Sequence, residues 1–162
     1  DRQLAAKLEP RASGPAMRLR AMRTLADAGV PVGVSVAPVI PGLNDSEIPA
    51  ILEAARDAGA QFATYSMVRL QGSGAEVFAD WLDRQLSPIK KGSILSAIRE
   101  THGGRLSDSR PMVRLTGEGG RADQIGQLFR VVARKLGFKR MRPEVTAENF
   151  RRRDPGQLEF DF

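Results

Sequence analysis

A five-residue pattern that occurs twice, thirty residues apart, constrains the fold of this chain more than any other feature. Leu25 to Gly29 reads LADAG, Ala55 to Gly59 reads ARDAG, and an apolar run follows each copy. A glycine in this position suits the left-handed residue just beyond a helix C-terminus. An apolar run after it is typical of a strand in a parallel sheet. The repeat therefore predicts a parallel α/β fold.

The first apolar run, residues 30–40, predicts a strand buried on both faces. Its side chains alternate between a larger set and a smaller set, which are Val32, Val34 and Val36, and Gly33, Ser35 and Ala37. The small face is expected to lie against something tightly packed or bound. Ligands of α/β folds sit at the carboxyl ends of parallel strands, so the loop at 38–45 is the expected ligand side.

Apolar periodicity predicts further elements on both sides of this strand. Helices are expected from Pro15, after Asp45, and over 77–86, 94–98 and 121–136, with a second strand at 62–70. Arg69 lies at the carboxyl end of that second strand, where a charged side chain is unusual. It is a candidate ligand contact, and a salt bridge to a covering helix is the equal alternative.

Two strands are too few for a stable parallel sheet, and residues 1–4 offer no strand ahead of the first helix. We therefore expect this chain to be the carboxyl-terminal part of a longer protein. The expected organisation is a set of βα units over 1–86, a basic helical extension over 87–140 and a flexible tail over 141–162.

Composition narrows the chemistry. The chain has no cysteine, which excludes disulfides, a cysteine nucleophile and a thiolate-held metal cluster within these residues. Its single histidine, His102, has no second histidine to pair with, so no metal site is expected and an ordinary loop histidine is the interpretation. No segment has the length and apolarity of a membrane span or a signal peptide, so we expect no membrane contact and a cytoplasmic location.

Positive charge is concentrated in the second half of the chain. Residues 99–153 carry 14 basic and 6 acidic side chains, whereas residues 1–98 carry 11 and 10. Such a block suits binding to nucleic-acid phosphates, and a solvated face of a basic protein is the equal alternative. The candidate phosphate contacts are Arg110, Arg114, Arg130, Arg134 and Lys135.

Several short segments together resemble one protein family. They are LEPRA at 8–12, LADAGVPV at 25–32, APVIPGLND at 37–45, GGRL at 103–106, DSR at 108–110, GEG at 117–119 and ARKLG at 133–137. In combination they are similar to the second half of radical S-adenosylmethionine proteins, in the spore photoproduct lyase-related branch often described as DNA repair photolyases. The resemblance covers nearly the whole chain.

The resemblance implies the carboxyl-terminal part of a partial (β/α)6 TIM-like barrel, followed by a helical extension. It also implies an enzyme that reductively cleaves S-adenosylmethionine with a 4Fe-4S cluster, in DNA repair or nucleic-acid modification. The cluster loop, C-x3-C-x2-C in the family, would lie upstream of Asp1, so these residues alone are expected to be inactive. No residue resembles the hydrogen-donor cysteine or tyrosines of true spore photoproduct lyases. The cofactor contacts implied are Glu9, Arg11, Ile40, Pro41, Gly42, Asn44, Tyr65, Met67 and Arg69; for Glu9 and Arg11, a salt bridge near the first helix is the alternative.

The last six residues, QLEFDF, resemble the peptide with which bacterial repair proteins bind the DNA sliding clamp. Gln157, Phe160 and Phe162 would be its contact residues, because a flexible leader with apolar anchors suits binding in a groove. Two alternatives to the DNA-directed enzyme stay open. One is a non-catalytic module that binds nucleic acid or the clamp, and the other is a radical enzyme that acts on a protein or a small molecule.

Overall fold

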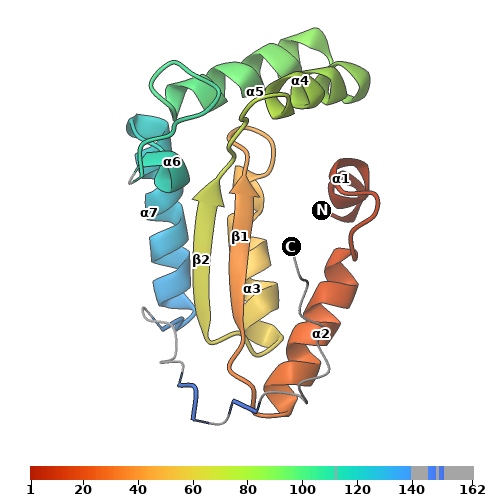
Figure 1. The fold of residues 1–162 in the computed structure, drawn as a ribbon, viewed down its shortest axis with the longest axis vertical. Helices are drawn as coiled ribbons and strands as arrows, with labels where there is room; N and C mark the ends of the chain where they lie inside the picture. Colours follow the sequence, from red (N-terminus) through yellow and green to blue (C-terminus); the bar gives the residue numbers. More distant parts are fainter. Residues whose placement is uncertain (112, 140–145, 149, 152–162) are drawn as a thin grey trace, which may run out of the picture.

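The structure is a computed structural model, and it describes residues 1–111, 113–139, 146–148 and 150–151. Two strands lie at its centre, with α3 behind them, α7 beside β2, α2 beyond β1, and α4 and α5 across the ends of the strands (Figure 1). The elements are α1 (Arg2–Leu8), α2 (Pro15–Asp27), β1 (Gly33–Val39), η1 (Asp45–Glu47), α3 (Ile48–Asp57), β2 (Phe62–Met67), α4 (Gly74–Gln85), α5 (Pro88–Glu100), α6 (Val113–Thr116) and α7 (Gly120–Lys135). The α/β class is confirmed, and a six-stranded barrel stays a prediction.

Both copies of the sequence repeat end a helix in the same way. After α2, Gly29 has φ 77° and Val30 N donates to the Leu25 carbonyl at 3.0 Å. After α3, Gly59 has φ 94° and Ala60 N donates to Ala55 O at 2.9 Å. These are Schellman ends, in which a left-handed residue lets the chain reverse and satisfy the last helical carbonyls. The predicted helix-to-strand joints are confirmed.

The two strands pair in parallel, as the repeat predicts. Gly33 lies opposite Phe62, and the register continues to Val36 opposite Tyr65. An irregularity follows, after which Val39 lies opposite Met67. The connection between the strands is α3, whose buried stripe of Ile48, Leu52 and Ala55 packs behind the sheet. This is a βαβ unit.

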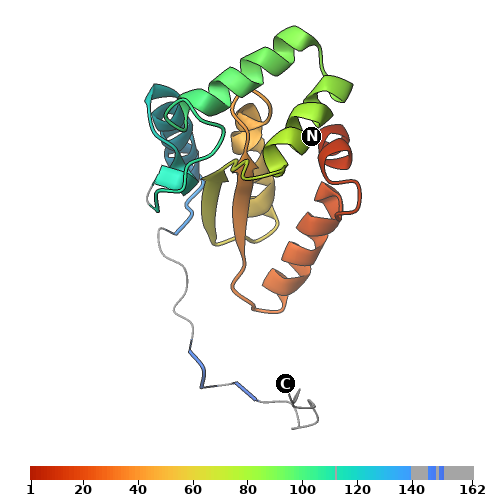
Figure 2. The same ribbon diagram turned by 45° about the horizontal axis from the view of Figure 1, so that its top comes forward.

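Two hydrophobic clusters hold the helices on the strands. One lies between the sheet, α3 and α7 and contains Val36, Val39, Ile48, Leu52, Met67, Ile125 and Phe129. The other joins the carboxyl ends of the strands to α4 and α5 and contains Ile40, Val68, Leu70, Phe78, Leu82, Ile94 and Ile98. Figure 2 shows α4 and α5 lying across this end of the sheet. The helices of the expected extension therefore share cores with the βα units.

Some sequence expectations are wrong in detail. In the described part of the chain only one face of β1 is buried, because Ser35 and Ala37 on the other face are exposed. Helical periodicity places Val77 in the inner stripe of α4, yet its side chain is 65% exposed. His102 lies in a loop but is only 1% exposed, and its Nδ1 lies 3.0 Å from the Ile98 carbonyl oxygen. The short helices α1 and α6 have too few turns to show a clear apolar period.

Within the part of the chain that the structure describes, no helix combines the length and apolarity needed to cross a membrane.

Candidate functional site

The open face of the β1–β2 sheet carries small side chains. Gly33, Ser35 and Ala37 of β1 lie on this face beside Thr64 and Ser66 of β2, while the alternate residues of both strands pack toward α3 and α7. Ser35 and Ala37 are exposed, and Thr64 and Ser66 are half-buried. In Figure 1 this face is turned toward the viewer, with α3 on the opposite side. Small hydroxyl-bearing residues here leave room for close approach of a flat group to the backbone.

The glycine at the start of this face is required by its neighbour. A Cβ on Gly33 would lie 2.1 Å from Cε2 of the Phe62 ring, which is far inside van der Waals contact. The Phe62 ring therefore covers the amino end of the face, and the free part of the face lies toward the carboxyl ends of the strands. Ligands of parallel α/β sheets bind at that end.

The loop after β1 is braced by one side chain. Asn44 Oδ1 accepts a hydrogen bond from Ile40 N at 2.7 Å, and Asn44 Nδ2 donates to the Pro38 carbonyl at 3.1 Å. Gly42 has φ 76°, which allows the tight turn between them. The Asn44 side-chain amide thus stabilises the loop by hydrogen bonds to two backbone groups of the same loop.

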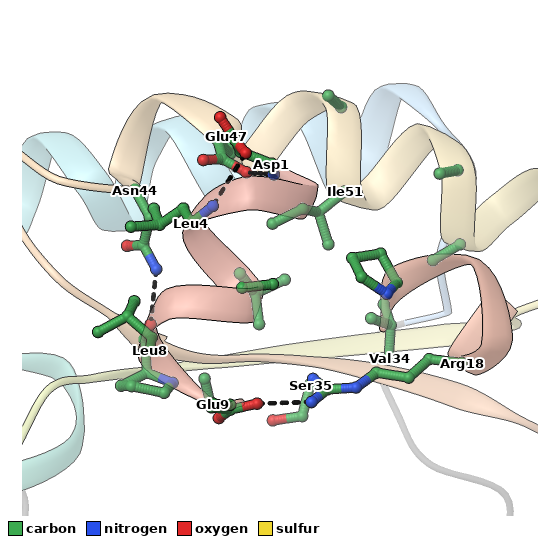
Figure 3. A pocket seen from close by; sticks show the side chains of 18 of the residues that line it. Asp1, Leu4, Leu8, Glu9, Arg18, Val34, Ser35, Asn44, Glu47 and Ile51 are labelled. Atoms are coloured by element: carbon green, nitrogen blue, oxygen red, sulfur yellow. Dashed lines mark hydrogen bonds and ion pairs between the residues drawn. The ribbon is translucent and has the colours of Figure 1, made fainter. Parts of the chain in front are cut away.

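A cavity of about 710 Å³ runs along the other edge of β1, between that strand and helices α1, α2 and α3. Its wall is mainly apolar and includes Leu4, Leu8, Leu19, Met22 and Ile51. Glu9 and Arg18 form an ion pair of 2.5 Å at its border, near Ser35 (Figure 3). Asn44 and Glu47 line the cavity at the carboxyl end of β1.

The structure brings only some of the predicted cofactor contacts together. Glu9, Ile40 and Asn44 line the cavity, although Ile40 is only 3% exposed and packs under α4 and α5. Pro41 is buried and Gly42 half-buried in the braced loop, whereas Arg11 and Arg69 are exposed.

Tyr65 and Met67 are placed away from the open face. Met67 is 1% exposed in the core behind the sheet, and the Tyr65 ring lies 4.8 Å from that of Phe129. Strand alternation brings Thr64 and Ser66 to the open face in their place. These two residues could have been identified from the sequence, because small side chains alternate along β2 as they do on the open face of β1.

The Tyr65 side chain is partly buried on the face of the sheet that packs against α7, and this burial shifts the pKa of its phenol. Desolvation raises the pKa of its phenol, and nearby Arg130 partly opposes that effect. Tyr65 is therefore neutral at physiological pH.

Among the predicted phosphate contacts, Arg110 is already paired. Its guanidinium donates to Asp108 Oδ2 at 2.5 Å and to Glu118 Oε1 at 2.6 Å. The hydrogen bonds from Arg110 lower the pKa of Asp108 to about 2, and both carboxylates raise the pKa of Arg110 above its usual value. Arg114 is half-buried. Arg110 therefore organises the loop before α6 and α7.

Helix α7 holds the remaining three predicted phosphate contacts on its exposed side. Arg130, Arg134 and Lys135 are exposed, and none of them forms an ion pair with a described carboxylate. Their spacing places Arg130 and Arg134 one turn apart. This stripe of three cations is available to an anionic partner.

The residues of this chain do not fit an iron-sulfur cluster. The sequence has no cysteine, and no group of three potential metal ligands occurs among the residues that the structure describes. The open face offers hydroxyl groups and room for close approach to the backbone, and Ser35 on this face lines the same cavity as Glu9. The predicted clamp contacts Gln157, Phe160 and Phe162 lie outside the described residues.

Comparisons with models of known protein families, with curated proteins and with solved structures find no match to this chain.

Proposed function

We propose that this chain is the carboxyl-terminal part of a radical S-adenosylmethionine enzyme and that it binds the nucleoside part of S-adenosylmethionine on the open face of the sheet. The observation that carries the proposal is the row of small residues ending at the braced loop, at the ligand side of a parallel sheet. The sequence resemblance supplies the cofactor and the reaction class.

The roles proposed for this chain are binding and positioning. Ser35 and Ala37 let the backbone approach a flat base, and the Thr64 and Ser66 hydroxyls offer hydrogen bonds to ribose. Glu9, held by Arg18, offers a carboxylate to ribose hydroxyls or to the cofactor's ammonium group. Asn44 positions the loop, because both ends of its amide already bond to backbone.

S-adenosylmethionine supplies a 5′-deoxyadenosyl radical when it is reductively cleaved, which is the chemistry implied by the resemblance. The cluster ligands do not fit this chain, and we propose that they belong to polypeptide that precedes Asp1. DNA is the proposed substrate, and a protein or small-molecule substrate is the alternative. A cytoplasmic location, expected from the sequence, is part of the same proposal.

The test is 5′-deoxyadenosine formation by the polypeptide that includes the residues preceding Asp1, reconstituted anaerobically with iron and sulfide. Cleavage of S-adenosylmethionine is expected, and Ser66→Phe should lower it at least tenfold by filling the open face. The matched control is Ser13→Phe, in the exposed turn before α2. A polypeptide that holds a cluster and yields no 5′-deoxyadenosine rules out the proposed chemistry, and equal activity in the two phenylalanine variants rules out the proposed face.

A second candidate, nucleic-acid binding, is favoured by the cation stripe of α7. Arg130, Arg134 and Lys135 are exposed and have no described carboxylate partner, unlike Arg110. Nucleic-acid binding is compatible with the proposed enzyme, because these cations would hold a nucleic-acid substrate. Sliding-clamp binding through Gln157, Phe160 and Phe162 remains a prediction from the sequence.

A further inference from the structure

We propose that the hydroxyl of Tyr65 and the guanidinium of Arg130 together bind one phosphate group of a nucleic-acid backbone. The hydroxyl comes from β2 and the guanidinium from α7, the helix beside that strand (Figure 1). The proposal rests on the nucleic-acid role proposed for the cation stripe of α7. It adds an uncharged donor to that stripe, and the effect of removing this donor can be measured separately from a loss of charge.

Gly126 of α7 brings the two groups to the same place. It is buried and lies one turn before Arg130, so both residues are on the same side of the helix. A Cβ on Gly126 would lie 2.8 Å from the Tyr65 hydroxyl oxygen and 3.0 Å from Arg130 Nη1. Long side chains of a helix lean toward its N-terminus, which is why Arg130 covers the turn that contains Gly126. Both polar groups therefore border the point where α7 has no side chain.

The Tyr65 ring is held by packing, so its hydroxyl is positioned before any ligand binds. The ring centroid lies 4.8 Å from that of Phe129, and the side chain packs against the core between the sheet, α3 and α7. A donor on a packed ring loses little conformational freedom on binding. Tyr65 can therefore contribute to binding without the entropy loss of a long flexible side chain.

Neither group is used elsewhere in the described part of the chain. There, the Tyr65 hydroxyl forms no hydrogen bond, and Arg130 forms neither a hydrogen bond nor an ion pair. Fully buried side-chain atoms that lack a partner occur among the described residues at His102, Ser107 and Arg114. The Tyr65 oxygen is not one of them, so solvent reaches it. An anion that arrives from solvent can then accept from both groups.

The phenol keeps the proton that it would donate. Burial raises the pKa of Tyr65, Arg130 partly opposes this effect, and the Asp123 carboxylate adds to it. A phosphate oxygen accepts strong hydrogen bonds from a guanidinium and from a hydroxyl, because the acceptor is charged. The pair thus offers a phosphate one cationic donor and one neutral donor.

The rest of α7 favours a chain of phosphates over a single ion. Arg134 and Lys135 lie about one turn beyond Arg130 and are exposed. A single phosphate bound at Tyr65 and Arg130 leaves these two cations unused, whereas a polyanion contacts them as well. Nucleic acid is therefore the class of ligand that fits the whole stripe.

Tyr65→Phe is the main test, because it removes one oxygen and keeps the packed ring. It should weaken binding of this chain to a labelled DNA duplex about tenfold, the effect of losing one hydrogen bond to a charged group. The slope of log affinity against log salt should stay at the wild-type value, because the hydroxyl carries no charge. Arg130→Gln should instead reduce that slope by about 0.9. Wild-type affinity in Tyr65→Phe would overturn the proposal.

A pair of alanine variants tests the geometry. Gly126→Ala places a methyl group against the hydroxyl and the guanidinium, and it should weaken DNA binding as Tyr65→Phe does. Gly92→Ala, in α5, is the matched control, because a Cβ there meets no atom within 4 Å. It should bind DNA like the wild type. Equal affinity of the two alanine variants would show that the site does not lie at Gly126.

Titration with inorganic phosphate separates the two sources of a phosphate group. The Gly126 amide resonance of the wild type should shift only at phosphate concentrations far above the DNA concentration that saturates the chain. A shift at low phosphate concentration, with DNA affinity unchanged in Tyr65→Phe, would assign the site to the free ion and overturn the proposal. Absence of DNA binding by the wild type would refute the nucleic-acid role as well, whereas wild-type binding that Tyr65→Phe leaves intact refutes this site alone.

Discussion

Asp108 is a residue whose charged form is stabilised by the fold. Its pKa is lowered from 3.8 to about 2 by hydrogen bonds from Arg110, so the folded state holds fewer protons than the unfolded state between these values. The stabilisation is fully present above pH 4 and is lost as the pH falls through about 2.

Asp108→Asn should therefore flatten the fall in unfolding free energy between pH 4 and pH 2, because an amide does not titrate. Urea unfolding at half-unit pH steps measures this slope. Asp27→Asn, at an exposed position on α2, is the matched control and should keep the wild-type slope. An Asp108→Asn profile that falls as steeply as wild type would contradict the assignment.

Residue-level prediction from the sequence depends on how clearly the strand pattern alternates. The pattern places Ser35 and Ala37 correctly on the small face of β1, because valine and small residues alternate without interruption. The family resemblance places Tyr65 and Met67 at the ligand, yet they pack behind the sheet. The contacts of Asn44 and Arg110 are set by loop geometry, which hydrophobic periodicity does not encode.

At the scale of elements, α2 and α3 have the same C-terminal motif but very different packing. Leu52 of α3 is 0% exposed within the core, whereas Leu19 of α2 borders the cavity and is half-buried. Deleting a fully buried leucine side chain removes many packing interactions and leaves a cavity.

Leu52→Ala should lower the unfolding free energy of residues 1–162 by about 2 to 5 kcal/mol. Leu19→Ala should lower it by less than about 1 kcal/mol, since little apolar area is buried there. Chemical denaturation of both variants measures the difference. Equal destabilisation would indicate that α2 contributes as much to the core as α3 does, which the exposure of its apolar residues contradicts.

The elements themselves are predictable where their signals are local. Sequence signals predict where α2, α3, α5 and α7 lie. These signals are a glycine just beyond the helix end, a proline in the first turn and apolar periodicity. The sequence alone cannot show that α4 and α5 lie across the strand ends, because that contact joins residues distant in the chain, such as Ile40 and Ile94. The sequence predicts a helix directly after Asp45, whereas Asp45–Glu47 form the short helix η1 and α3 begins at Ile48.

At the scale of the whole molecule, the cation stripe of α7 predicts salt-dependent binding to double-stranded DNA. Changing Arg130, Arg134 and Lys135 together to glutamine should weaken binding and reduce the slope of log affinity against log salt by about 0.9 for each phosphate that is no longer neutralised. Fluorescence anisotropy with a labelled duplex at several salt concentrations measures both effects.

The control variant for this measurement removes three exposed cations elsewhere, at Arg2, Arg20 and Lys90, so the net charge falls equally. It should retain the wild-type slope if α7 is the surface that binds DNA. A matching decrease in affinity for the two triple variants would show that binding follows net charge alone.

Helices α4 and α5 lie over the carboxyl ends of the strands, and their packing with Ile40, Val68 and Leu70 closes that direction of approach. A molecule that binds on the open face must then approach from the side of the sheet and not past the carboxyl ends of the strands. For the proposed enzyme, this sideways route favours a reacting group on a protruding or unstacked part of a larger substrate. For the proposed enzyme, α4 and α5 would therefore restrict the shape of the substrate that can reach the open face.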